Sequence, residues 1–133
     1  MNPLIVLLRA AQLFAHAAHN AVTGPAFFGD HAFFGDSYEA FEGAYDGAVE
    51  LSLADGEVLD FTRIGLDAAM LAASMPVSGS AEALFRTQLQ LEERLRESIG
   101  ELVEEADDAG QSFLQKLAED SKVRTYKIRQ RLA

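Results

Sequence analysis

The segment Ser80–Ala106 has the sequence SAEALFRTQLQLEERLRESIGELVEEA, the longest periodic run in the chain. Its apolar residues recur at steps of three and four, the spacing of one face of an α-helix. Ser80 is the expected N-cap, and Glu82 lies in the first turn, where an acidic side chain is favourable. The apolar positions are Leu84, Phe85, Leu91, Leu95, Ile99, Leu102, Val103 and Ala106. The run therefore predicts a helix of about seven turns.

Two stretches on the N-terminal side of this segment repeat the helical spacing. Apolar residues in 4–18 form one stripe along a helix of about five turns, and the Thr-Gly-Pro sequence at 23–25 is expected to end that helix. Residues 33–49 predict a second helix with aromatic side chains on one side and Asp30 as its cap.

The C-terminal part of the chain predicts one more long helix. Asp108 and Gln111 have the spacing of a capping box, and apolar residues follow at helical steps over 114–132. A shorter helix is expected around 61–73, after a loop over 51–60 that contains Asp-Gly. No stretch has the spacing of a strand. The sequence therefore predicts an all-α four-helix bundle with a short helix in the long connection between helices two and three.

The composition limits both the architecture and the partners. A chain of 133 residues with 49% apolar residues can bury one core, so a single domain over 1–133 is expected. Eleven basic against 21 acidic residues give a net charge of −10, which opposes binding to a phosphate backbone. Without cysteine there are no disulfides or thiolate metal sites, and a cytoplasmic location is expected. Polar residues interrupt the apolar stretch 1–21, so we expect no membrane span. Helical periodicity continues over 4–21, past any plausible cleavage point, so we expect no signal peptide.

One part of the chain carries negative charge without counter-charge. No Lys or Arg occurs between Ala10 and Thr62, while nine acidic residues do. Glu42, Asp46 and Glu50 step by four along the second predicted helix, a spacing of like charges that costs a few tenths of a kcal/mol per pair. A metal cation would remove that penalty. A solvated acidic face is the alternative interpretation.

Two histidines favour the metal interpretation. His19 lies near the end of the first predicted helix and His31 near the start of the second, and imidazole with carboxylate suits iron, manganese or zinc. Ordinary hydrogen-bonded histidines at helix ends are the alternative. His31 and Asp46 are separated by about 22 Å if they share one helix, so they cannot bind one ion within one chain. A metal site would therefore join two subunits, as an antiparallel two-fold pairing of the second helices would allow.

Other chemistries lack their motifs. All three histidines lie at or before His31, so the Glu-x-x-His motifs of an intrachain di-iron bundle are absent. No Gly-x-Ser-x-Gly elbow and no phosphate-binding glycine loop with a lysine occur. The sequence thus gives little support for covalent catalysis.

The residues discussed above resemble the signature of a known family, the Dps proteins or mini-ferritins. That signature has a His-Trp-x-Val-x-Gly-x-x-Phe segment, a second His twelve residues after the first, and an Asp-x-x-x-Glu pair. The matching residues are His19-Asn-Ala-Val-Thr-Gly24-Pro25-Ala-Phe27-Phe28, His31, Phe34, Tyr38, Tyr45, Asp46 and Glu50. Residues 106–114 are similar to the start of the family's last helix, so the resemblance covers nearly the whole chain.

The resemblance implies a ferritin-like fold and an iron-oxidising, iron-storing function. It implies a dodecameric cage built from two-fold dimers, in which His19 and His31 of one subunit and Asp46 and Glu50 of the other form a catalytic ferroxidase centre. Ferrous iron (Fe²⁺) would be oxidised by hydrogen peroxide or oxygen and stored as a ferric (Fe³⁺) mineral, which would protect the cell from both reactants.

The chain departs from the family pattern at three places. Gly35 stands where the family commonly has an Asp, and Asp36, the nearest carboxylate, is rotated by about 100° around a helix. Asp36 is therefore an additional candidate ligand, and the centre is expected to hold one or two metal ions. Asn20 and Leu51 replace a Trp and an Arg of the family. A structural shell or DNA-protecting protein with a degenerate, weak metal site is the alternative function.

DNA binding is expected to be weak or absent at physiological salt. Family members that compact DNA carry a mobile, Lys-rich extension before the first helix, whereas this helix is expected to begin at about Pro3. The basic residues of segment 116–131 are interpreted mainly as cations matched to a helix C-terminus. Gly43 and Gly47, four residues apart, predict either a close approach of another helix or an exposed face.

Overall fold

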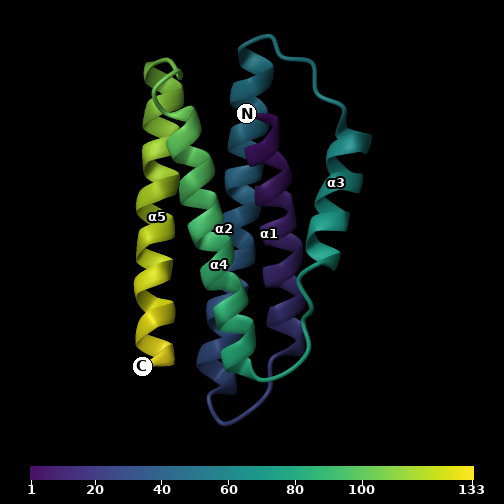
Figure 1. Ribbon diagram of the computed structural model, residues 1–133, viewed down its shortest axis with the longest axis vertical. Helices are drawn as coiled ribbons and strands as arrows, with labels where there is room; N and C mark the ends of the chain where they lie inside the picture. Colours follow the sequence, from purple (N-terminus) through teal and green to yellow (C-terminus); the bar gives the residue numbers. More distant parts are fainter.

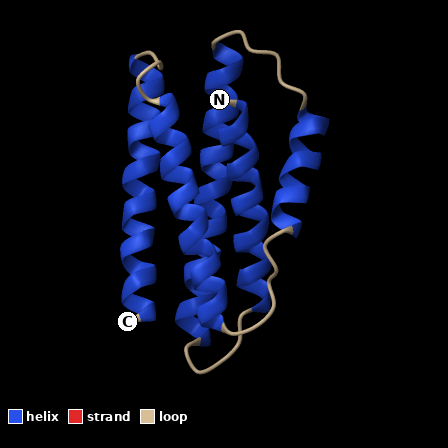
Figure 2. Cartoon of the chain, in the orientation of Figure 1, coloured by secondary structure: helices blue, strands red, loops and turns tan.

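The computed structural model describes all 133 residues and contains only helices and their connections (Figures 1 and 2). This confirms the all-α class and the short helix in the connection between the second and third long helices. The helices are α1 (Asn2–Ala21), α2 (Phe27–Ala54), α3 (Phe61–Ala73), α4 (Ala81–Leu102) and α5 (Asp108–Leu132). No helix has the length and apolarity that a membrane crossing requires.

The four long helices form a bundle made of two antiparallel hairpins, α1–α2 and α4–α5 (Figure 1). The connection between the hairpins runs from the upper end of α2 down to the lower end of α4, so α2 and α4 point in the same direction (Figure 1). The long connection expected from the sequence therefore crosses from one end of the bundle to the other. Helix α3 lies within it and packs along α1.

Helix α1 is the centre of the packing. It contacts α2, α3 and α4, and ten of its 20 residues are buried. A core of 22 buried apolar side chains joins it to the other helices, with Phe34 of α2 and Phe85 of α4 packed at a ring distance of 4.7 Å. Because burial of each large apolar side chain stabilises the fold by roughly 1.5–3 kcal/mol, this core holds α1 and α2 in one fixed relation.

The expected role of Asp30 as a helix cap is wrong. Helix α2 begins at Phe27, its N-cap residue Ala26 makes no side-chain cap bond, and Asp30 lies inside the first turns. The Asp30 carboxylate is buried and accepts hydrogen bonds of 2.9 and 3.0 Å from the Arg131 guanidinium. A buried bidentate ion pair with arginine stabilises a carboxylate more than a solvent-exposed N-cap hydrogen bond does. The contact with Arg131 therefore determines where the Asp30 side chain lies.

The boundary between α4 and α5 also differs from the prediction. Helix α4 ends at Leu102 instead of reaching residue 106, and the N-cap of α5 is Asp107, whose side chain accepts from the Gly110 amide at 2.9 Å. Several carboxylates follow Leu102, and negative charge is unfavourable at a helix C-terminus but favourable at an N-terminus. The N-cap predicted for α4 is confirmed, because Ser80 accepts from the Ala83 amide at 3.2 Å.

Candidate metal centre

The two candidate histidines meet at the corner between α1 and α2. His19 lies in the last turn of α1 and His31 in the second turn of α2, and their rings stack with centroids 3.7 Å apart and planes at 19°. The short connection between these helices contains Gly24 at φ +113°, a backbone conformation that favours glycine. The tight corner therefore brings together two residues that are twelve positions apart.

Two hydrogen bonds fix both imidazoles. Nδ1 of His19 bonds to the carbonyl oxygen of His31 at 2.7 Å, and Nδ1 of His31 bonds to the carbonyl oxygen of His19 at 2.6 Å. A carbonyl oxygen only accepts, so each Nδ1 carries the proton and each Nε2 keeps its lone pair in the neutral ring. This is the tautomer in which histidine binds a metal through Nε2, with the other nitrogen held by a carbonyl group.

Gly35 makes room for the His19 ring. A Cβ atom at this position would lie 2.9 Å from Nδ1 and 3.0 Å from Cε1 of His19. Any side chain at residue 35 would therefore displace the ring from its hydrogen-bonded place. Gly35 therefore lies at a point where α1 and α2 approach each other closely.

Aromatic side chains surround the histidine pair. Phe27 stacks on His31 at a ring distance of 4.9 Å, and Tyr38 meets the His19 ring edge-on at 5.5 Å. The exposed His16 stacks on Tyr38 at 4.1 Å and lies one helical turn before His19. His16 was not among the predicted site residues, although its three-residue spacing from His19 was a usable signal.

The candidate carboxylates lie elsewhere in the same chain. Helix α2 is continuous through His31 and Asp46, which confirms the premise that one helix carries both. Asp46, Glu50 and Asp36 are exposed and make no ion pair or hydrogen bond through their side chains. No group of three or more His, Asp or Glu side chains in the single chain is close enough to hold a metal ion. One chain thus brings the two imidazoles together but not the acids.

The one fully buried glutamate of the bundle is already bound by protein groups. Glu92 of α4 accepts hydrogen bonds from Arg124 at 2.8 and 3.0 Å, from Ser121 at 2.8 Å and from Gln88 at 3.1 Å. A buried carboxylate with this many donors is compensated without a metal ion. Glu92 is therefore not available as a metal ligand in the interior of the bundle.

The two glycines predicted at a helix contact have different surroundings. A Cβ at Gly47 would lie 2.6 Å from Cε1 of Phe113 in α5, so Gly47 admits an aromatic side chain of the same chain. Gly43 is exposed, with open space at the Cβ position. Gly47 thus accommodates a side chain of α5 instead of a closely packed helix, while Gly43 lies on the free face of α2.

Comparison with protein families gives a match over almost the whole chain. The family model described as ferritin-like domain matches residues 1–130. No curated protein and no solved structure matches.

Proposed function

Because the chain belongs to the ferritin-like domain family, a family of iron-binding and iron-storing proteins, we propose that it is an iron-oxidising mini-ferritin of the Dps type. Its substrate is ferrous iron, and the oxidant is hydrogen peroxide or oxygen. The ferroxidase centre is shared by two subunits, with His19 and His31 from one and Asp46 and Glu50 from the other. Asp36 is an additional candidate ligand on the same helix.

The hydrogen-bonded histidine pair carries this proposal. Both rings are held in the tautomer that leaves Nε2 available, and they are half-buried at a helix corner. Neutral imidazoles bind ferrous iron, and carboxylates from the partner would compensate its positive charge. With peroxide, two ferrous ions each give one electron to one hydrogen peroxide molecule. Its O–O bond breaks, and with two protons from solvent the two oxygen atoms become two water molecules.

A second observation supports the two-subunit arrangement. Helix α3 packs on α1 through Ile64 and Ala68, and it also exposes large apolar side chains. Leu66 and Met70, on the face turned away from Ile64 and Ala68, are 56% and 71% exposed, and Phe61 at the start of the helix is 52% exposed. Neighbouring exposed apolar side chains are typical of a surface that another protein covers. A second copy of the chain would cover this face, and two-fold dimers would be the units of a dodecameric cage.

A mixing experiment tests the shared centre. The double variants His19→Ala/His31→Ala and Asp46→Ala/Glu50→Ala should each lose peroxide-driven iron oxidation. When the two are unfolded together and refolded as a mixture, a heterodimer contains one intact centre and one that lacks all ligands. Random pairing should therefore restore about a quarter of the wild-type rate.

Two results would contradict the proposal. A centre formed within one chain would give no recovery on mixing. Equal rates for the wild type, Asp46→Ala and buffer alone would remove the enzymatic function altogether. Glu39→Ala is the matched control, because Glu39 is an exposed acid of α2 outside the proposed ligand set and its loss should leave the rate unchanged.

The alternative function is a shell with a degenerate, weak metal site. The observation that favours it is Gly35, which leaves no carboxylate one turn after His31. Under this alternative the protein would assemble into the same cage. An anomalous-scattering map of iron-soaked crystals would then show no iron at the two-fold interface.

A further inference from the structure

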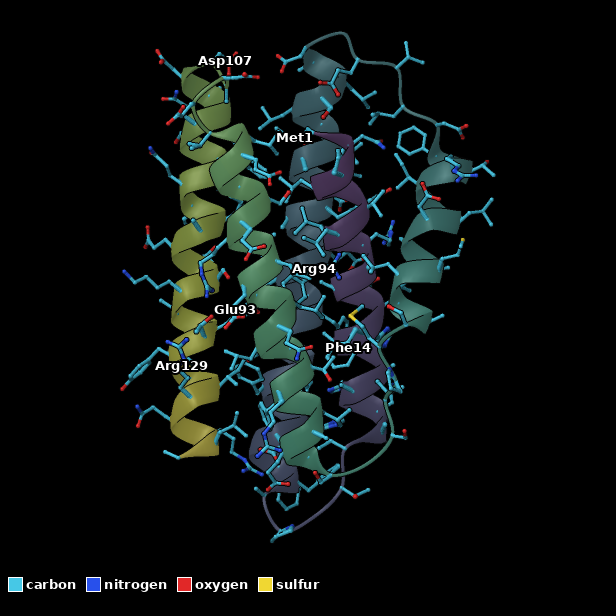
Figure 3. The ribbon with its side chains drawn as sticks, viewed as in Figure 1. Met1, Phe14, Glu93, Arg94, Asp107 and Arg129 are labelled. Carbon is cyan, nitrogen blue, oxygen red and sulfur yellow. The ribbon has the colours of Figure 1, made fainter.

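A cleft between α4 and the C-terminal half of α5 is lined with cationic side chains and has a volume of about 510 Å³. We call it the basic cleft. Figure 3 shows Arg129 on the lower part of α5, where the cleft lies. The lining residues are Arg96, Lys122, Thr125, Tyr126, Arg129 and Gln130.

The cations of the basic cleft are not paired with carboxylates. Its lining contains three cations and no carboxylate, although the chain as a whole has a net charge of −10. Arg96, Lys122 and Arg129 form no ion pair, whereas Arg124 and Arg131 on the same helix are paired with acids. Like charges that line one hollow repel one another, so an anion in the cleft would be stabilised.

Arg96 is fixed in position by hydroxyl groups. One guanidinium nitrogen donates to Ser121 Oγ at 2.9 Å and to Thr125 Oγ1 at 2.6 Å, and both hydroxyl residues are buried. Ser121 in turn donates to the buried Glu92 at 2.8 Å. The remaining N–H groups of Arg96 donate to no protein acceptor. Because the side chain is already ordered, little rotamer entropy is lost when these groups bind an oxyanion.

A planar apolar surface lies beside these cations. Tyr126 is 63% exposed, and it shares one face of α5 with Lys122 and Arg129, at helical steps of four and three residues. An exposed aromatic ring next to cations suits a ligand that combines a phosphate group with a flat ring, since stacking and charge then act together. The volume of the cleft is within the range of small-molecule sites.

We propose that the basic cleft binds a small phosphate ester of a planar aromatic compound, with the chemistry of a nucleoside monophosphate. Arg96, Lys122 and Arg129 bind the phosphate oxygens, and Tyr126 stacks on the ring. This site lies on other helices than the histidine pair and does not depend on the iron-oxidising function.

Calorimetric titration with AMP tests the proposal. The wild type should bind AMP with a saturable heat, inorganic phosphate more weakly, and adenosine far more weakly. Lys122→Gln and Arg129→Gln should each weaken AMP binding about tenfold, because each removes a charge-assisted hydrogen bond. Tyr126→Ala should weaken AMP binding and leave phosphate binding unchanged. Arg86→Gln is the matched control, because Arg86 is an exposed, unpaired cation of α4 outside the cleft.

Three results would refute the proposed site. The first is that AMP shows no saturable binding at millimolar concentration, the second is that Arg86→Gln loses as much affinity for AMP as the cleft variants, and the third is that adenosine binds as tightly as AMP. Binding of a short DNA duplex without binding of AMP would show a diffuse polyanion surface instead of a site. Equal affinity for AMP and phosphate would refute the role of Tyr126. The cleft variants should keep the wild-type rate of iron oxidation, so failure here is distinguishable from failure of the proposed function.

Discussion

Replacement of Gly35 by alanine separates helix stability from metal binding. In the interior of a helix, Gly→Ala stabilises the fold by about 1 kcal/mol. At residue 35 the new Cβ would lie 2.9 Å from Nδ1 of His19, so the ring must move and its hydrogen bond to the His31 carbonyl is lost. That bond contributes about 0.5–1.5 kcal/mol. The two effects nearly cancel, and Gly35→Ala should unfold at about the wild-type denaturant concentration.

Metal binding should respond differently. Displacement of the His19 ring removes the carbonyl bond that orients it, and loss of such an orienting contact typically weakens metal binding about 10–100-fold. Anaerobic titration with ferrous iron, together with urea unfolding, measures both quantities on the same protein.

Gly100→Ala is the matched control for this substitution. Gly100 lies in α4 and has nothing within 4 Å of the Cβ position, so the variant should gain stability and bind iron normally. If Gly35→Ala gained as much stability as Gly100→Ala and kept wild-type iron affinity, the histidine geometry described above would be wrong.

Three further predictions concern the ion pairs and the charge of the chain. Arg124→Met leaves the buried Glu92 without its cation and should lower the free energy of unfolding by about 3–5 kcal/mol. Urea unfolding measures this loss, and a loss below about 1 kcal/mol would contradict the assigned pairing. The pKa of Glu82 is held below its ordinary value of 4.5 by a hydrogen bond from its own backbone amide and by Arg131. The ionised Glu82 carboxylate therefore stabilises the fold above pH 4.5, and this contribution is lost as the pH falls through the lowered pKa. Glu82→Gln should flatten the acid side of a plot of melting temperature against pH, and an unchanged slope would refute this. In a gel-shift assay at about 150 mM salt the protein should not retard duplex DNA, and a stable shifted band would overturn that expectation.

Local signals in the sequence predicted those features that depend on local interactions. Ser80 caps α4 as expected, and α3 occupies the predicted residues 61–73, because a cap and a loop signal act within one turn. Asp30 could not be placed in this way. Its partner Arg131 is 101 residues away, and a single sequence contains no signal for that pairing.

The candidate centre was predicted in part for a similar reason. His19 lies at the end of one predicted helix and His31 at the start of the next. These positions predict that both histidines lie at one corner, since two antiparallel helices joined by a short loop have these ends side by side. The contact between Gly35 and His19 could not be predicted, because it depends on how closely α1 approaches α2. Whether Asp46 and Glu50 meet the histidines of a second chain stays a prediction.

The two hydrogen bonds between His19 and His31 tie each ring to the main chain of the opposite helix. If two subunits share a centre as proposed, each subunit would hold both imidazoles in place before association. Association would then supply only the carboxylates, so iron binding would require little further ordering. Fraying of this helical corner would displace both rings together, and such a centre would lose both nitrogen ligands in one step.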